Sequence, residues 1–326
     1  MGEDGAGPGS GEAFRHDPVM VAEVTDLLGA VPSGPVVDAT VGGGGHAGAL
    51  LGAHDHLEVI GLDRDADALA AAGRALCPFG DRVALRHARF DRIAMICEEL
   101  GHERVSGVLF DLGVSSPQLD RADRGFAYGT DGPLDMRMDR GQTTTASDVV
   151  NGYPEDRLAR VLAVHGDERF ARRVAHALVG ARPLSGTREL AEVVRTAIPA
   201  ATRRRGGHPA RRTFQAIRIE VNRELDVLPD ALEQAIDLLV PRGRCVVLAY
   251  HSGEDRIVKR RFVDASTGGC VCPPVLPCVC GARPTVRILR RGARPTAAEV
   301  AANPRSESAR LRAVEKLVDA SNGRVT

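Results

Sequence analysis

The sequence predicts an α/β protein in which a parallel sheet is interrupted by an inserted all-helical domain. Short apolar runs alternate with amphipathic stretches through the first third of the chain, as in strands joined by helical crossovers. This alternation stops after Gly113, and helical patterns then dominate up to residue 212. A strongly apolar run at residues 244–250 indicates that the sheet resumes there.

Each expected element follows from a local residue pattern. Apolar runs bounded by turn residues predict strands at 35–40, 58–63, 82–87, 107–112, 244–250 and 285–289. Apolar positions at helical spacing predict helices at 46–53, 65–76, 91–100, 146–150, 154–164, 167–180, 187–197, 213–240 and 253–264. An insertion after the fourth strand emerges where such sheets bind ligands, so we expect it to cover a substrate site.

Residues 35–48 indicate a site for a nucleoside-containing cofactor. An apolar run ends at Asp38, breaks into the turn Gly42–Gly45 and continues as a helix from His46. Glycines let backbone N–H groups approach a ligand closely, and Asp63, about 20 residues further on, can accept hydrogen bonds from ribose hydroxyls. The glycines also match G-x-G-x-x-G, so this segment alone leaves both a dinucleotide and S-adenosylmethionine open.

Four polar side chains lie at or just beyond the carboxyl ends of separate expected strands. They are Asp38, Asp63, Asp111 and His251. Because parallel strands end at the same edge of a sheet, we expect these residues to gather there although they are far apart in sequence. Taken singly, each has a structural explanation, such as a helix cap for Asp38 or Asp111 and a hydrogen-bonded loop residue for His251.

Composition places the chain among soluble globular proteins, with 43% hydrophobic and 26% charged residues. No apolar stretch approaches the roughly 18 residues of a membrane span, and the N-terminus lacks the apolar core of a signal peptide. We therefore predict a cytoplasmic protein with no membrane partner and with a disordered tail at residues 1–13. Net charge is zero, but Arg203–Arg205 with Arg211 and Arg212 form either a solvated basic loop or a phosphate-contacting patch.

The seven cysteines fall into two groups. Three lie in apolar segments and are expected to be buried thiols: Cys77, Cys97 and Cys245. The others form two C-x-C pairs separated by a proline-rich link: Cys270, Cys272, Cys278 and Cys280. Close pairs of thiolates suit zinc, but C-x-C is less diagnostic than C-x-x-C, so the sequence favours a loop without a metal.

Several longer strings make the function specific. They occur in order along nearly the whole folded chain: Asp111–Asp120 (DLGVSSPQLD), Asp131–Asp139 (DGPLDMRMD), Arg212–Arg218 (RTFQAIR) and Tyr250–Arg256 (YHSGEDR), preceded by His16 and Pro18. Together these strings closely resemble the bacterial 16S ribosomal RNA cytosine-N4 methyltransferases, the MraW-type family. The resemblance covers about residues 14 to 320.

The resemblance implies a Rossmann-like methyltransferase domain, formed by 14–114 and 213–326, with residues 115–212 as an inserted helical substrate-recognition domain. It implies S-adenosylmethionine as the methyl donor and 16S ribosomal RNA as the partner, within the small ribosomal subunit, and it allows a homodimer. Carried over position by position, the cofactor contacts fall on Gly44, Gly45, His46, Asp63, Phe90, Asp111 and Gln118.

The chemistry requires an acceptor for the N–H groups of a poorly nucleophilic exocyclic amine. Asp111, with the hydroxyls of Ser115 and Ser116, is the acceptor set that we favour, and His251 is a further catalytic candidate. The base must also be unstacked to reach the donor. The aromatic residues available to stack on it are Phe126, Tyr128 and Phe214.

Two positions depart from the family pattern. Gly43 stands where arginine is more common, and Gly253, two residues after His251, stands where leucine is usual. Two functions of other classes also remain open at this point. One is a dinucleotide-dependent oxidoreductase, supported only by G-x-G-x-x-G, and the other is a non-catalytic RNA-binding module with a zinc ribbon.

Overall fold

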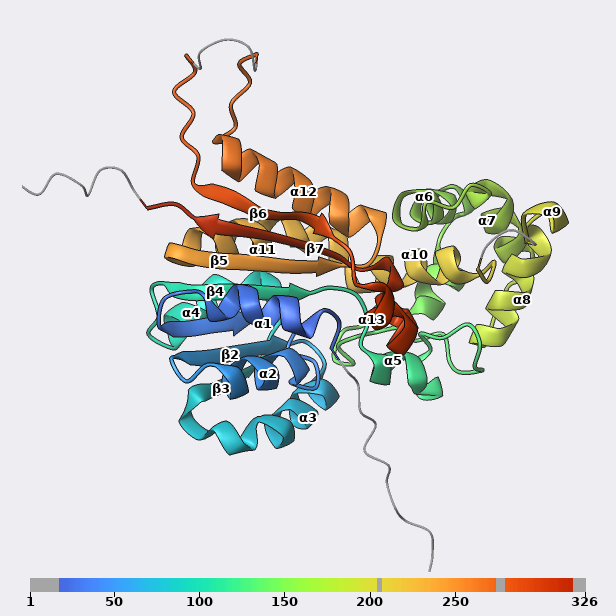
Figure 1. Cartoon of the computed structure of the whole chain (residues 1–326). Helices are drawn as coiled ribbons and strands as arrows, with labels where there is room; N and C mark the ends of the chain where they lie inside the picture. The colour runs from blue at the N-terminus through green and yellow to red at the C-terminus, as the bar shows by residue number, and fades with distance from the viewer. Residues whose placement is uncertain (1–17, 204–206, 274–278, 319–326) are drawn as a thin grey trace, which may run out of the picture.

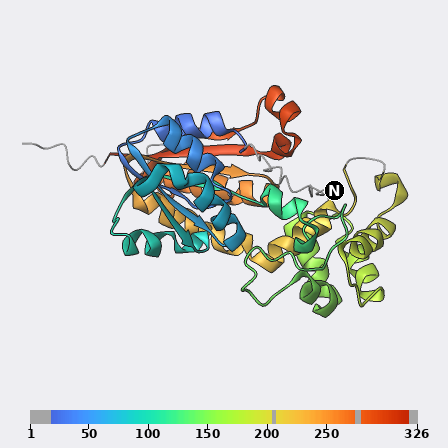
Figure 2. The same ribbon diagram turned by 90° about the horizontal axis from the view of Figure 1, so that it is seen from below.

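A computed structural model describes residues 18–203, 207–273 and 279–318. It contains a seven-stranded sheet with helices on both faces and a separate block of helices beyond one end of the strands (Figure 1). The block lies beside the sheet rather than over either face, as the view from below shows (Figure 2). The predicted tail at residues 1–13 lies outside the described residues.

The sheet has the strand order β3-β2-β1-β4-β5-β7-β6. Strands β1 to β5 are parallel, whereas β7 is antiparallel to both of its neighbours. In chain order they are β1 (Gly34–Asp38), β2 (Leu57–Asp63), β3 (Val83–His87), β4 (Val105–Asp111), β5 (Leu239–Ala249), β6 (Val286–Ala293) and β7 (Arg310–Lys316).

Two layers of helices bury the two faces of the sheet. One layer consists of α1 (Val21–Gly29), α2 (Gly45–Ala53) and α3 (Ala66–Leu76), which pack on residues such as Val36 and Leu109. The other consists of α4 (Ile93–Glu99), α11 (Glu224–Leu238) and α12 (Ser252–Thr267), which pack on Val37 and Phe110. Alternate residues of each strand point to opposite faces, so near-continuous apolar runs are buried on both sides.

The helical block has a hydrophobic core of its own. It contains α6 (Glu155–Gly166), α7 (Ala171–Gly180), α8 (Thr187–Ala197), α9 (Ala200–Arg203) and α10 (Arg211–Asn222). The amphipathic α10 contributes Phe214, Ile217 and Val221 to this core, so the cluster extends past residue 212. Short elements complete the described chain: α5 (Ser116–Asp120), α13 (Ala297–Ala302), η1 (Cys77–Arg82), η2 (Phe90–Arg92), η3 (Ala122–Arg124), η4 (Asp148–Gly152) and η5 (Pro304–Ser308).

The fold class predicted from the sequence is confirmed, but several elements differ from expectation. The single helical stretch expected at 213–240 is two helices, because Arg223 adopts a left-handed conformation with φ of 52°. The helix expected at 167–180 begins only at Ala171, and the segment 146–150 forms a single π-helical turn at Asp148–Gly152. Strand β7, which lies between β5 and β6, and helix α1 were not predicted.

The cysteine prediction is partly wrong. Cys97 and Cys245 are buried, whereas Cys77 is exposed because it opens the surface turn η1 after α3 ends. In the part of the chain that the structure describes, no helix is long and apolar enough to cross a membrane.

Candidate functional site

The carboxyl ends of β1, β2 and β4 bring three carboxylates to one edge of the sheet, as the sequence predicted. Asp38 and Asp63 end β1 and β2, and Asp111 ends β4. Asp38 is close enough to both of the others for their charges to raise its pKa. This edge faces the helical block, which lies beyond the ends of the strands (Figure 1).

The glycine turn lies against this edge and is tied to it through Asp63. Gly42 and Gly44 have positive φ angles of 52° and 87°, a conformation that favours glycine. The Gly42 N–H donates to Asp63 Oδ2 at 2.9 Å, and the Asp65 N–H donates to Asp63 Oδ1 at 2.8 Å. Asp63 therefore organises the turn in addition to any ligand contact. A side chain at Gly43 would meet open space, so the arginine common in the family has room here.

His46, Asp111 and Tyr250 form a compact cluster beside the turn. His46 Nε2 lies 3.5 Å from Asp111 Oδ2, an ion-pair distance without hydrogen-bond geometry. The Tyr250 hydroxyl donates to Asp111 Oδ1 at 2.6 Å, and the Asp111 backbone N–H donates to Thr40 Oγ1 at 2.7 Å. Sequence reasoning missed Tyr250. The signal available was its position directly after the β5 strand, next to His251.

Burial determines the protonation of this edge. Desolvation raises the pKa of Asp38 to about 7, although the charge of His46 opposes the shift. Burial lowers the pKa of His46, but the nearby carboxylates of Asp111 and Asp38 raise it by more, so the net shift is upward. Desolvation also raises the pKa of Tyr250, so its hydroxyl keeps its proton and acts as a donor to Asp111.

Phe90 and Gln118, both expected at the cofactor site, have defined surroundings. Phe90 is half-buried and makes an edge-to-face contact with Phe110, their ring centroids 5.8 Å apart. The buried Gln118 donates through Nε2 to Asp65 Oδ2 at 2.8 Å and accepts from the Ser115 N–H at 3.1 Å. Gln118 therefore connects the start of the insertion to the first residues after β2.

The residues proposed to accept the amine protons begin just after β4. Ser115 precedes α5 and is partly exposed, and Ser116 is buried at the start of that helix. Asp111 keeps part of its side chain accessible, with an exposed fraction of 22%. An accessible carboxylate at this edge has the geometry of a proton or hydrogen-bond acceptor.

His251 lies next to Tyr250 but turns toward α12. Its Nδ1 accepts the Gly253 N–H at 3.1 Å and caps the helix, and its Nε2 lies 3.2 Å from Glu254 Oε1. The side chain of Glu254 in turn accepts the Tyr250 N–H at 2.8 Å. These contacts give His251 a positioning role for the β5–α12 turn, and its catalytic role stays a prediction. A Cβ at Gly253 would lie 3.1 Å from the His251 ring, so the usual leucine requires a small shift.

Two of the three aromatic residues expected to stack on the RNA base are core residues instead. Phe126 and Phe214 are 5% and 4% exposed, inside the core of the helical block. Tyr128 is half-buried and already stacks on His208, with ring centroids 4.4 Å apart. Whether these rings are buried or exposed depends on tertiary packing, which the sequence pattern does not reveal.

Two cavities lie in the helical block, outside the glycine turn. The first, about 330 Å³, lies between α6, α10 and the start of α11 and is lined by polar and charged residues that include Arg157, His165, Glu220 and Arg223. The second, about 580 Å³, lies at Asp131–Pro133 and the start of α8. Neither is lined by Asp38, Asp63 or Asp111, so these two cavities are not part of the polar edge.

The polar edge suits a cationic cofactor. Three carboxylates gather there, and His46, buried among them, has two ring nitrogens without a hydrogen bond in the described structure. A ligand carrying sulfonium and ammonium charges would compensate these carboxylates and lower the pKa of Asp38. S-adenosylmethionine has both charges and a ribose for Asp63, so the residues present fit it.

A mainly parallel α/β sheet with a glycine turn and acidic strand ends at one edge defines a Rossmann-like protein with a site for a nucleoside-containing cofactor. The sequence model of the MraW methylase family matches residues 13–317, nearly the whole chain, and the protein therefore belongs to the MraW methylase family. Its cofactor is S-adenosylmethionine. This membership decides against the dinucleotide-dependent oxidoreductase and the non-catalytic module that the sequence had left open.

Individual relatives agree with the family. The chain is 54% identical to a ribosomal RNA small subunit methyltransferase H from Thermobifida fusca, covering 93% of this chain and 94% of that one. It is 50% identical to the protein of the same name from Symbiobacterium thermophilum, over 94% and 98%. An rRNA methylase from Streptococcus thermophilus aligns with a TM-score of 0.42 and 13% identity, covering 94% of this chain and 99% of that one.

Proposed function

We propose that this protein transfers a methyl group from S-adenosylmethionine to the exocyclic N4 of a cytosine in the decoding region of 16S ribosomal RNA. The observation that carries the proposal is the Asp111 cluster at the edge of the sheet, in a chain about half identical to methyltransferases of small-subunit ribosomal RNA. The cytosine and its N4 position rest on the motif strings of the sequence.

The residues assigned to the cofactor lie on the glycine turn and the strand ends. Gly44, Gly45 and His46 would hold the methionine part, Asp63 the ribose hydroxyls, and Phe90 the adenine ring, with Asp111 and Gln118 completing the site. When bound, the cofactor supplies an electrophilic methyl group. Residues 14–114 and 213–326 form this part of the enzyme in our proposal.

Asp111 is proposed to accept the N–H groups of the target amine. Hydrogen bonding to a carboxylate draws electron density toward the amine nitrogen and gives the released proton a destination. The Tyr250 hydroxyl, 2.6 Å away, fixes the orientation of Asp111 and leaves its other oxygen beside His46. Ser115 and Ser116, which lie at the start of α5, would add acceptor oxygens.

The helical insertion at 115–212 is proposed to recognise RNA. Its loop begins at the carboxyl end of β4, directly beside Asp111. Arg211 and Arg212 are exposed at the start of α10, whereas Arg204 and Arg205 of the same basic cluster lie outside the described residues. Exposed arginines at this position suit phosphate contacts.

The test is mass spectrometry of 16S ribosomal RNA from cells with and without the gene, together with single-turnover methylation of isolated small subunits. At saturating S-adenosylmethionine, Asp111→Asn should lower the rate of methyl transfer by about 100-fold or more, in addition to any loss of cofactor affinity. Asp264→Asn, which changes an exposed carboxylate of α12 in the same way, is the matched control. If the cytosine N4 is still methylated in cells that lack the gene, the proposed substrate is refuted. A normal rate of methyl transfer by Asp111→Asn would refute the role of Asp111 as the acceptor.

A further inference from the structure

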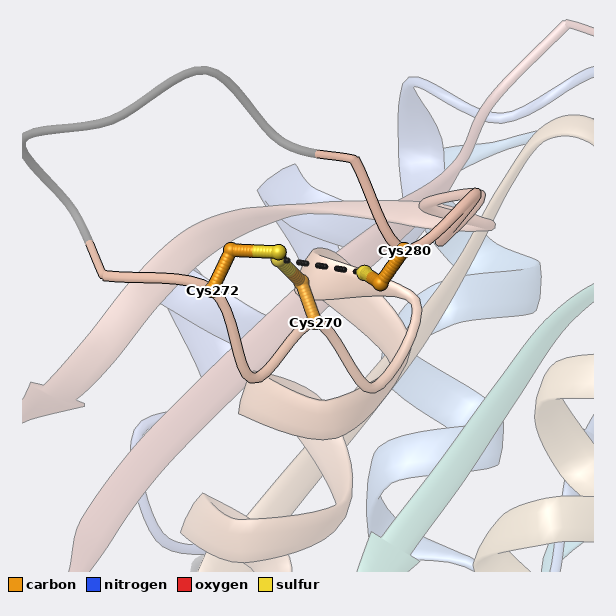
Figure 3. Close-up of side chains that lie close together, drawn as sticks. All are labelled: Cys270, Cys272 and Cys280. Atoms are coloured by element: carbon orange, nitrogen blue, oxygen red, sulfur yellow. Dashed lines mark hydrogen bonds between the residues drawn. The ribbon is translucent and has the colours of Figure 1, made fainter.

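The loop between α12 and β6 contains a cluster of thiols that the methylation chemistry does not use. The Sγ atoms of Cys270, Cys272 and Cys280 all lie within 4.8 Å of one another. Figure 3 shows the side chains of Cys270 and Cys272 turned toward that of Cys280. The C-x-C spacing favoured a loop without a metal, but three converging sulfur atoms lead to a different conclusion.

We propose that Cys270, Cys272 and Cys280 bind a structural zinc ion. Zinc–thiolate bonds of about 2.3 Å in tetrahedral geometry place neighbouring sulfur atoms roughly 3.8 Å apart. The Cys270 and Cys280 sulfur atoms are 3.6 Å apart, close to that spacing. A disulfide would require about 2.05 Å and would leave the third thiol unused. Cys278, the remaining cysteine of the loop, lies outside the described residues.

The base of the loop already holds the ligands near one another. The Gly269 N–H donates to Asp264 O at 3.0 Å, and the Cys270 N–H donates to Thr267 O at 3.2 Å, which anchors Cys270 to the end of α12. A Cβ at Gly268 would come within 2.5 Å of the Arg283 backbone, so the two arms pack closely. Gly281, with φ of 71°, turns the chain directly after Cys280.

Among the residues of the loop that the structure describes, those beside the ligands bury little apolar surface. Val271 and Val279, the residues beside the ligands, are 88% and 89% exposed, so they bury almost no apolar surface. Loops of this length without secondary structure need a local source of order. A thiolate-bound metal supplies one, and zinc is the metal that a cluster of cysteine ligands favours. Binding would release the thiol protons to solvent.

The position of the loop indicates a structural role for the ion. The loop projects from the end of α12 away from the helical block, whereas the carboxyl ends of β4 and β5 face the block (Figure 1). Asp111 ends β4, and Tyr250 directly follows β5. A metal here cannot touch the methyl-transfer site. Zinc binding and methyl transfer are therefore separable properties, and the first can be measured without the second.

Elemental analysis of the full-length protein, purified without chelators, tests the proposal. We expect about one zinc ion per chain in the natural protein and less than about a tenth in the double variant Cys270→Ser with Cys272→Ser. Cys77→Ser, which removes an exposed thiol outside the loop, should retain the zinc. Cobalt exchange gives a second readout, because cobalt–thiolate coordination produces visible and near-ultraviolet absorption that the double variant should lack.

Calorimetric binding of S-adenosylmethionine by each variant shows that it is folded. Three results would overturn the proposal: natural protein that contains no zinc and gives no cobalt–thiolate spectrum, a double variant that keeps its metal, or an iron–sulfur chromophore in its place. A Cys270–Cys280 disulfide, found by mass spectrometry without reduction, would overturn it equally. None of these results bears on the proposed methylation, which is measured independently.

Discussion

Replacing Arg124 by methionine tests how the insertion is attached to the cofactor edge. Arg124 is 3% exposed, and its guanidinium donates to Asp65 Oδ2 at 2.8 Å, where Asp65 caps the first turn of α3. The same guanidinium donates to the carbonyl oxygens of Arg137 and Met138, at 3.1 Å each. One buried side chain thus joins η3, the loop around residue 137 and the start of α3.

The expected cost is large because Arg124→Met leaves a buried carboxylate with less compensation. Removing one partner of a buried ion pair lowers the free energy of unfolding by about 3 to 5 kcal/mol. Gln118 still donates to Asp65, which favours the lower part of that range. Arg121→Met is the matched control: Arg121 is 48% exposed and pairs with Asp67 and Asp123, and exposed pairs contribute about 0 to 1 kcal/mol.

Urea unfolding of both variants at neutral and acidic pH measures the difference. Burial raises the pKa of Asp65, but hydrogen bonds from Gln118 and Arg124 lower it more, so the folded pKa lies below the usual 3.8. The stabilisation is therefore fully present above the usual pKa of 3.8 and is lost as pH falls through the lower pKa of the folded state. The gap between natural protein and Arg124→Met should narrow in acid. Equal losses for Arg121→Met and Arg124→Met at neutral pH would refute the reasoning.

Two further predictions concern the cofactor edge. Asp63→Ala should weaken S-adenosylmethionine binding by about tenfold or more, because hydrogen bonds to a charged acceptor contribute roughly 1.5 to 3 kcal/mol; unchanged affinity by calorimetry would remove Asp63 from the site. The raised pKa of Asp38, about 7 against 3.8, means that the cofactor-free protein loses stability as pH rises through this window, by up to about 4 kcal/mol. Asp38→Asn should reduce this fall in the free energy of unfolding, measured with urea from about pH 5 to about pH 8. If the pH dependence is unchanged, other groups such as His46 cause the loss.

The sheet could be predicted because its strands carry their own signal. Near-continuous apolar runs such as Val105–Asp111 are buried on both faces, and β1, β2 and β4 each end in an aspartate. Strand β7 lacked such a run, because Arg310, Arg312 and Glu315 interrupt its apolar residues. Their side chains find partners only in the fold, as when Arg312 pairs with Asp255 of α12.

The carboxylates of the site could be predicted from topology, but their partners could not. Parallel strands place Asp38, Asp63 and Asp111 at one edge whatever the details of packing. The Tyr250–Asp111 hydrogen bond depends on the rotamers of two residues 139 positions apart. For the same reason Phe126 and Phe214 were expected to face RNA although they are buried: an aromatic ring in a loop or an amphipathic helix does not reveal which side is covered.

The insertion is bound to the sheet domain too closely to be removed as a unit. Deleting 115–212 would take away both Gln118 and Arg124, leaving Asp65 buried without its side-chain donors. It would also split the core that α10 shares with α6, because Phe214 and Val221 pack in that core. At the end of α10, the Asn222 side chain donates to the Met136 carbonyl and accepts from the Met138 N–H. The Asn222 carbonyl accepts from the guanidinium of Arg64, which follows β2. Loss of cofactor binding in such a deletion would therefore report misfolding. A point substitution at an exposed site, such as Arg211→Ala, instead separates RNA recognition from stability.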